Sequence, residues 1–259
     1  MSSDLGRFCW YDLMTSDPKA AKDFYTKVIG WGTEPWEGGP MPYTMWKASR
    51  GPIGGVTELP EEVKQAGAPP HWIAYISVDD VAASANEAVK LGGKIEKEPT
   101  EIPNQGTFAV LSDPQGAVFC IYKSASDMPS PEGPPQTGEF SWHELNTSDH
   151  ESAWSFYEKL FAWEKTTSMD MGPELGTYQM YGRQGAELGG MFNKPKEIPG
   201  PPFWLYYAKV EDIHQVVEKV KENGGKILNG PMEVPGGDWI AQCMDPQGAA
   251  FAIHSVAKK

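Results

Sequence analysis

The stretch FCWYDLMTSDPKAAKDFYTKVIGW, from Phe8 to Trp31, decides the fold because the chain contains it twice. It aligns without a gap to FSWHELNTSDHESAWSFYEKLFAW, from Phe140 to Trp163, at an offset of 132 residues. A repeat of this length indicates that the chain is built from two copies of one structural unit.

Later motifs keep the two copies aligned along the rest of the chain. At the same offset, PPHWIAYISVDDV matches PPFWLYYAKVEDI, and DPQGAVFCIY matches DPQGAAFAIH; these segments begin at Pro69, Pro201, Asp113 and Asp245. IGGV at Ile53 and LGGM at Leu188 lie 135 residues apart. The second copy therefore contains three extra residues before this motif, in a position typical of a loop.

The segment between the copies is rich in proline, serine and glycine, which is typical of a linker. The length of 259 residues also fits two domains better than one. We expect a first domain over 1–123, a linker over 124–135 and a second domain over 136–259.

Each copy divides again into two modules with the same order of elements. In the first module, alternating apolar residues predict a strand before Asp17, which has the features of a helix N-cap, and Pro18 fits the first helical position. Gly30 ends that helix. Short strand candidates separated by turn residues follow, and the second module repeats the plan. The expected fold class is α+β, with four βαβββ modules forming curved, mostly antiparallel sheets that carry helices on one face only.

The alternation of side chains along a strand predicts which residues line the free, concave face of each sheet. We expect Leu13 and Leu145 to face the helices, so that their sequence neighbours face the cup. The side chains expected to line the two cups and bind a ligand are Trp10, Asp12, Tyr75 and Tyr122 in the first copy, and Trp142, Met180 and Tyr207 in the second. Glu144 and His254 face the second cup by the same alternation. Aromatic walls with a few polar groups are typical of small-molecule sites.

These motifs, in this order, resemble the vicinal oxygen chelate superfamily of glyoxalases, bleomycin resistance proteins and extradiol dioxygenases. The resemblance rests on the strand–Asp–helix opening with its FY and GW pairs, the GG strand and the DPxG hairpin, and it covers almost the whole chain. The tandem form resembles glyoxalase-like antigen and hydroxylase proteins of actinobacteria. The resemblance implies the fold more directly than it implies a reaction.

Enzymes of that superfamily generally bind one divalent metal through His, Glu or Gln side chains of the cup. The first-strand ligand positions fall on Trp10 and Trp142, and the last-strand positions fall on Cys120 and Ala252. The remaining positions fall on glycines and on Ile73 and Leu205, which have no donor side chain. Divalent metals of this kind need imidazole or carboxylate ligands. We therefore expect no standard metal site and no cofactor.

Glu144 and His254 are the candidate catalytic residues. We expect them on neighbouring strands of the second cup, where a carboxylate beside an imidazole can fix its tautomer for acid–base chemistry. The same pair could instead be a structural polar contact. His143 faces the helices by alternation, which favours a packing role.

Composition limits the partners of the chain. The net charge of −13 repels nucleic acids and anionic membranes, and no apolar run is long enough to span a bilayer. The N-terminus lacks the features of a signal peptide, so we expect a cytoplasmic protein. The three cysteines have no CxxC spacing, and we expect them to be reduced and mostly buried.

Three functions remain open. The first is a metal-independent protein that binds a small apolar or aromatic molecule, of the sequestration or resistance type, as a monomer or homodimer. The second is a lyase, isomerase or oxygenase that acts without metal through Glu144 and His254, or through a non-standard metal site. The third is a structural or protein-interaction role, which would require the cups to be filled by their own side chains.

Overall fold

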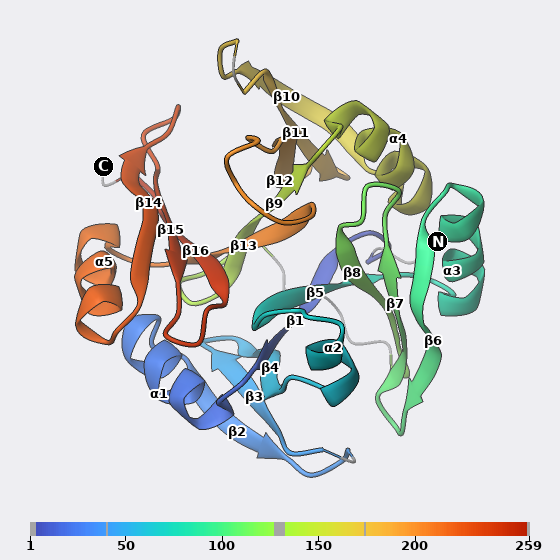
Figure 1. The fold of residues 1–259 in the computed structure, drawn as a ribbon, viewed down its shortest axis with the longest axis horizontal. Coiled ribbons are helices and arrows are strands. Elements are labelled where there is room, and N and C mark those ends of the chain that lie inside the picture. Colours follow the sequence, from blue (N-terminus) through green and yellow to red (C-terminus); the bar gives the residue numbers. More distant parts are fainter. Residues whose placement is uncertain (1–3, 40, 127–132, 174, 258–259) are drawn as a thin grey trace. The chain divides into compact units, whose positions relative to one another are not determined.

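The computed structural model describes residues 4–39, 41–126, 133–173 and 175–257. Residues 127–132 of the expected linker lie outside the described residues. The four expected modules are present in chain order (Figure 1).

The two modules of the first copy follow the predicted order of elements, with one short additional helix between them. The first contains β1 (Phe8–Thr15), α1 (Pro18–Val28), β2 (Gly32–Trp36), β3 (Tyr43–Ala48) and β4 (Gly51–Glu58), followed by α2 (Glu61–Gln65). The second contains β5 (His71–Ser77), α3 (Val81–Lys90), β6 (Lys94–Ile102), β7 (Gly106–Ser112) and β8 (Val118–Ser124).

The second copy repeats this order. Its first module contains β9 (Phe140–Thr147), α4 (His150–Phe161), β10 (Glu164–Asp170), β11 (Thr177–Arg183) and β12 (Ala186–Asn193). Its second module contains β13 (Phe203–Lys209), α5 (Ile213–Glu222), β14 (Lys226–Glu233), β15 (Trp239–Met244) and β16 (Ala250–Ser255).

The helices begin where the sequence predicts. The side chain of Asp17 accepts a hydrogen bond from the backbone N–H of Ala20 at 3.0 Å, and Pro18 occupies the first turn. Asp80, Asp149 and Asp212 cap α3, α4 and α5 in the same way. After α1 the chain turns at Gly30, whose φ of 89° lies in the region that favours glycine.

The sixteen strands form two eight-stranded sheets, which confirms the predicted fold class. The strand orders are β2-β3-β4-β1-β5-β8-β7-β6 and β10-β11-β12-β9-β13-β16-β15-β14. The first strand of each module pairs in parallel with the last, and the other pairs within a module are antiparallel.

The compact units of the structure do not follow the two sequence copies. Unit 1 consists of Met1–Trp10, Ala74–Ser130 and Trp142–Trp204, and unit 2 consists of Tyr11–Ile73, Pro131–Ser141 and Leu205–Lys259. Unit 1 thus takes most of the second module and of the third, and unit 2 takes most of the first and of the fourth. Residues 124–135 connect the two copies in the sequence. Their role as a boundary between domains stays a prediction.

The core of unit 2 joins two sequence motifs from different copies. The hydroxyl of Tyr25, in the FY pair of α1, donates to the Asp245 carboxylate at 3.1 Å and accepts from the indole N–H of Trp72 at 2.9 Å. Asp245 also accepts the backbone N–H groups that close the DPQG turn. Phe251 packs edge-on against Tyr25, and α1 lies beside α5 (Figure 1).

Unit 1 contains the same arrangement with the copies exchanged. The hydroxyl of Tyr157 in α4 donates to Asp113 at 3.0 Å and accepts from Trp204 at 3.3 Å. Phe119 packs edge-on against Tyr157. Burial raises the pKa of both aspartates, Asp113 and Asp245. The FY and DPxG motifs occur in both copies because the tyrosine of each copy donates a hydrogen bond to the aspartate of the DPxG turn in the other copy.

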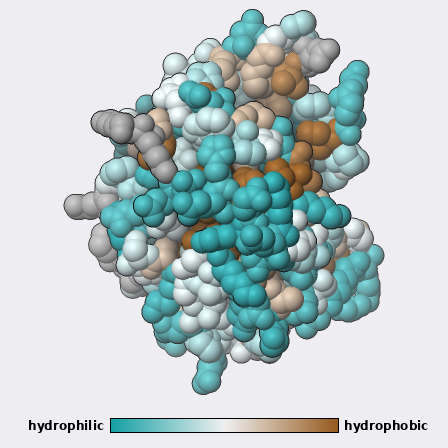
Figure 2. Space-filling view, turned by 90° about the vertical axis from the view of Figure 1, so that its left-hand side faces the viewer, coloured by the Kyte–Doolittle hydropathy of each residue, from teal (hydrophilic) through white to brown (hydrophobic). Residues whose placement is uncertain are grey.

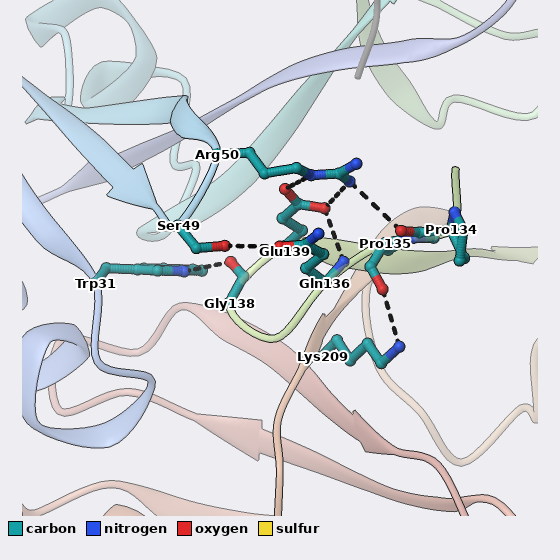
Figure 3. A network of polar contacts seen from close by, with 9 residues as sticks. All are labelled: Trp31, Ser49, Arg50, Pro134, Pro135, Gln136, Gly138, Glu139 and Lys209. Carbon is teal, nitrogen blue, oxygen red and sulfur yellow. Dashed lines mark hydrogen bonds and ion pairs between the residues drawn. The ribbon is translucent and has the colours of Figure 1, made fainter. Parts of the chain in front are cut away.

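The segment before β9 is held in unit 2 by charged and polar contacts (Figure 3). The guanidinium of Arg50 binds both carboxylate oxygens of Glu139, with its Nε 2.6 Å from Oε1. Burial alone would raise the pKa of Glu139, but the hydrogen bonds from Arg50 and from the backbone of Gln136 lower it. The carbonyl of Gly138 accepts the indole N–H of Trp31, in the GW pair, at 2.6 Å.

The cysteines and the surface match the sequence expectations in part. Cys120 and Cys243 are buried, but Cys9 is exposed, which corrects the expectation for that residue. Figure 2 shows a mostly hydrophilic face on which apolar side chains form a few separate patches. Within the part of the chain that the structure describes, no helix is both long and apolar enough to cross a membrane.

Candidate functional site

Strand register places the predicted acidic residues on the face opposite the helices. Leu13 and Leu145 are fully buried, and Asp12 and Glu144 precede them in the strands. Glu144 lies beside Gly190 of β12, which lies beside Met180 of β11, so these three positions share one face. Trp10 and Trp142 share the faces of Asp12 and Glu144 by alternation, and both are half-buried.

In unit 1, Glu144 is the centre of a buried polar cluster. Its side chain is 6% exposed, and its Oε2 accepts the hydroxyl of Tyr178 at 3.1 Å. The Tyr178 oxygen accepts the indole N–H of Trp142 at 2.8 Å, and the Asn146 amide lies 3.4 Å from Oε1 of Glu144. A buried carboxylate is stable only when such donors replace its water.

In unit 2, Asp12 has the equivalent partner. It is 6% exposed, and its Oδ1 accepts the hydroxyl of Tyr43 at 2.6 Å. The GG motif explains how these tyrosines fit. A Cβ on Gly55 would lie 2.0 Å from the Tyr43 ring, and a Cβ on Gly190 would lie 2.1 Å from the Tyr178 ring. Glycine is therefore required wherever the tyrosine lies across the strand to reach the acid.

Tyr43 and Tyr178 were not among the site residues predicted from the sequence. A signal for them was present, because Tyr-x-Met recurs at Tyr43 and Tyr178 with the 135-residue offset of the GG motif. Met180 is the one residue of this pattern that was predicted, and it lies half-buried on the predicted face.

Tyr75 and Tyr122, which the sequence predicts to line the first cup, lie near each other in unit 1. Their ring centroids are 6.3 Å apart, and Phe108 of β7 lies 6.0 Å from Tyr75. The ammonium group of Lys97 lies 5.6 Å from the centroid of Phe108. The Tyr122 hydroxyl donates to the carbonyl of Gln105 at 2.6 Å. This group of residues is an aromatic surface with a cation at its margin.

Tyr207 and His254 lie on one face of unit 2. Tyr207 pairs with Ala252, and Lys209 pairs with His254, between the parallel strands β13 and β16. The amide of Gln242 donates to the Tyr207 hydroxyl at 3.2 Å. His254 contacts Ser141 at 2.9 Å through Nδ1 and Asp238 at 3.0 Å through Nε2.

The expectation that Glu144 and His254 lie on neighbouring strands is wrong. In the strand order β12-β9-β13-β16, strand β13 separates β9 from β16. Tyr178 and Asn146 donate to Glu144, whereas His254 contacts Ser141 and Asp238.

His143 has the packing role that the sequence favours. It is 5% exposed, stacks on Phe8 at a centroid distance of 3.8 Å, and its Nδ1 lies 2.6 Å from the carbonyl of Leu188. Burial lowers its pKa to about 4. The histidine is therefore neutral near neutral pH, and its Nδ1–H donates to Leu188.

The residues at the positions expected for metal ligands do not fit a divalent metal. Trp10, Trp142 and Ala252 offer no ligand atom, and Cys120 offers a single thiol, which does not make a ligand set. Among the described residues, no group of three or more His, Cys, Asp or Glu side chains could hold a metal ion. The absence of a standard metal site stays a prediction for solution experiments.

We expect added Zn²⁺, Ni²⁺ or Mn²⁺ to leave the melting temperature nearly unchanged. A specific site filled to 100 times its Kd would add about 2.7 kcal/mol to the free energy of unfolding. Differential scanning calorimetry with each metal, before and after a chelator, measures this effect. A large stabilisation that the chelator reverses would reveal a site that these donor positions do not account for.

Comparisons with known proteins agree with the fold. The family model described as "Glyoxalase/Bleomycin resistance protein/Dioxygenase superfamily" matches residues 7–121 and 139–253. "Putative glyoxylase CFP32" of Mycobacterium tuberculosis (strain CDC 1551 / Oshkosh) is 40% identical over 124 residues, which are 48% of this chain and 46% of that protein. The matched region is thus about half of either protein. "Anthracycline biosynthesis protein DauV" of Streptomyces sp. (strain C5) is 26% identical over 96% of this chain and 92% of its own length.

Solved structures show the same architecture at low sequence identity. The Mn(II)-bound glyoxalase from Novosphingobium aromaticivorans has a TM-score of 0.67 and 16% identity, covering 99% of this chain and 84% of that one. The 2,3-dioxygenase LapB from Pseudomonas sp. KL28 has a TM-score of 0.68 and 12% identity, covering 99% and 94%. The two matched segments coincide with the two copies of the repeat, and the chain belongs to the glyoxalase/bleomycin resistance protein/dioxygenase superfamily.

Proposed function

We propose that the chain binds a planar aromatic molecule bearing a hydroxyl group, and that it does so without a metal at the standard positions. The observation that supports this most directly is the buried carboxylate–tyrosine pair, which occurs in both copies as Asp12–Tyr43 and Glu144–Tyr178. In each copy a glycine makes room for the tyrosine.

The chemistry of the pair suits a hydroxyl donor. An ionised carboxylate has about four lone-pair sites, so Glu144 can accept a ligand hydroxyl in addition to its protein donors. The tyrosine oxygen can likewise accept or donate. Each buried hydrogen bond to a charged acceptor contributes about 1.5–3 kcal/mol to the binding free energy. This is enough to select a hydroxylated ligand over the same molecule without the hydroxyl group.

Aromatic side chains on the predicted faces of both copies favour an aromatic ring system as the ligand. Trp142 lies next to the Glu144 cluster, and Tyr75, Phe108 and Tyr122 form the aromatic surface of the first copy. Aromatic side chains offer flat faces for offset stacking. Two relatives over most of the chain are named anthracycline biosynthesis proteins, which supports a fused-ring ligand.

We expect an anthracycline to quench the tryptophan fluorescence of the protein in a saturable titration, and Glu144→Gln to weaken its binding by about 10-fold to 100-fold. The glutamine keeps the size of the side chain but removes the charge that strengthens the hydrogen bond. Isothermal titration calorimetry of both proteins provides the affinities.

Glu187→Gln is the matched control, because Glu187 is an exposed glutamate on β12 that accepts from Thr166 and Thr167. It should bind like the unmodified protein. Equal affinities for the Glu144 and Glu187 variants would contradict the role of the carboxylate–tyrosine pair. Failure of the anthracycline and of smaller hydroxylated aromatics to bind would contradict the function as a whole.

The same incubations test the alternative of a lyase, isomerase or oxygenase that acts through Glu144 and His254. Mass spectrometry of the recovered ligand should show it unchanged. A product that the wild type forms and either single variant, Glu144→Gln or His254→Asn, does not form would favour the enzyme.

A further inference from the structure

Ser141, His254 and Asp238 form a continuous hydrogen-bonded relay within unit 2. Ser141 Oγ lies 2.9 Å from His254 Nδ1, and His254 Nε2 lies 3.0 Å from Asp238 Oδ2. The three side chains come from the start of β9, from β16 and from the turn before β15. A hydroxyl, an imidazole and a carboxylate in this order are the components of an activated serine nucleophile.

The donors and acceptors of the relay allow one assignment when the histidine is neutral. An ionised aspartate can only accept hydrogen bonds. Nε2 of His254 therefore carries the ring proton, and this N–H donates a hydrogen bond to Asp238. Nδ1 is then an acceptor, and the hydroxyl of Ser141 donates to it. Burial alone would raise the pKa of Asp238, but hydrogen bonds from His254 and from the backbone N–H of Ala257 lower it. Asp238 is therefore ionised and able to orient the ring.

The first copy lacks the histidine and the aspartate of this relay, although it keeps the packing contact of the serine position. Ser141 Oγ also lies 3.4 Å from the carbonyl of Tyr207, and in the first copy the equivalent Cys9 Sγ lies 3.4 Å from the carbonyl of Tyr75. That contact needs only a small polar side chain. The first copy has Tyr122 in place of His254 and Gly106 in place of Asp238. The imidazole and carboxylate are thus additions of the second copy that the shared contact does not require.

The surroundings of the imidazole are partly open, with the Lys209 position of β13 on one side and apolar residues of β14 and β15 on the other. Ile240 lies beside His254 between β15 and β16, and Met232 lies beside Ile240 between β14 and β15. Ser141 is half-buried, and the His254 and Asp238 side chains are 17% and 38% exposed, so a small reagent can approach the relay. An acyl group with an apolar chain can pack against Ile240 and Met232 on this side.

We propose that Ser141 is a nucleophile that His254 activates and Asp238 positions, and that it accepts acyl groups from small apolar esters. In the first step Ser141 Oγ bonds to the ester carbonyl carbon while its proton passes to His254 Nδ1. The C–O bond to the alcohol then breaks, and the alcohol leaves with that proton. Water attacks the acyl-serine in the same way, which releases the acid and restores the hydroxyl of Ser141.

This activity goes beyond the proposed ligand binding and does not rest on it. The carboxylate–tyrosine pairs involve other residues, and covalent labelling of Ser141 needs no bound aromatic ligand. Loss of anthracycline binding in the Glu144→Gln variant would leave the labelling intact, so the two proposals can fail separately.

We expect a small alkyl fluorophosphonate to label the full-length protein once, at Ser141, with loss of fluoride. Intact-mass and peptide mass spectrometry identify the adduct and its site. Ser141→Ala should abolish the labelling, and Ser155→Ala, at an exposed serine of α4, should leave it unchanged. A wild-type protein that remains unlabelled at Ser141, under conditions that label a known serine esterase, would overturn the proposal.

Two further variants test the partners of the serine. His254→Asn should slow labelling by at least about 100-fold, and added imidazole should restore part of the rate by occupying the vacated space. Asp238→Asn should slow labelling by about 10-fold or more with little change in melting temperature. Labelling rates that do not change in these variants would contradict the roles of His254 and Asp238, because a purely structural contact would affect stability and not reactivity.

Discussion

A fragment containing only the first sequence copy, residues 1–123, is expected not to form a stable monomer. In the full chain the modules of this copy belong to different compact units, and each packs against a module of the second copy. Phe24 and Tyr25 contact Phe251, and Phe119 contacts Phe156 and Tyr157. Removal of the second copy would expose the side chains of the first copy that make these contacts.

The fragment would lose a large part of the free energy of unfolding of the full chain. Exposing one large apolar side chain costs about 1.5–3 kcal/mol, and whole domains are stable by only about 5–15 kcal/mol. Phe24, Tyr25, Trp31 and Phe119 together would use most of that margin. Tyr25 would also lose its acceptor Asp245, and Trp31 would lose the carbonyl of Gly138. Size-exclusion chromatography with light scattering, together with urea unfolding, measures the outcome.

Mixing the two copies provides the control. Fragments 1–123 and 136–259, refolded together, should recover the near-ultraviolet circular dichroism of the full chain, because Tyr25 and Tyr157 regain their partners. A first-copy fragment that unfolds cooperatively as a monomer, with the stability of the full protein, would contradict the importance of the contacts between copies.

The repeat in the sequence predicted most of the fold. The offset of 132 residues gave the two copies, and the recurring order of elements gave the four modules. Alternation predicted a buried side for Leu13 and Leu145, and both are fully buried. The choice of partner for each module could not be predicted in this way. The FY and DPxG motifs are the same in both copies, so the sequence allows Tyr25 to meet Asp113 or Asp245 equally well. Only the folded chain shows that Tyr25 meets Asp245.

The candidate site was harder to predict because its partners lie across strands. Alternation gave the face of Glu144 and of His254, but it contains no information on strand order, and β13 lies between their strands. The residue that does meet His254 is Asp238, which precedes β15 and has only Gly106 as its counterpart in the first copy. A repeat-based analysis cannot find a residue that occurs in one copy alone.

Acidification is expected to destabilise the protein through His143, by about 2–3 kcal/mol between pH 7.5 and pH 4.5. Burial lowers the pKa of His143 to about 4, compared with about 6.5 for an unfolded histidine. Between these values the unfolded chain binds a proton that the folded chain does not. The contribution of the neutral histidine is therefore fully present above pH 6.5 and is lost as the pH falls through 6.5 toward 4. Urea unfolding at several pH values gives the free energies.

His143→Gln should remove this pH dependence, because glutamine does not titrate and its amide can still donate to the carbonyl of Leu188. At pH 7.5 the variant should be less stable than the wild type by about 1 kcal/mol, since it loses the stacking on Phe8. At pH 4.5 the order should reverse, with the variant more stable by about 1–2 kcal/mol. His214→Gln is the control, because His214 is exposed and should leave the pH dependence unchanged. A His143 variant whose stability falls with pH as steeply as that of the wild type would show that other groups control acid unfolding.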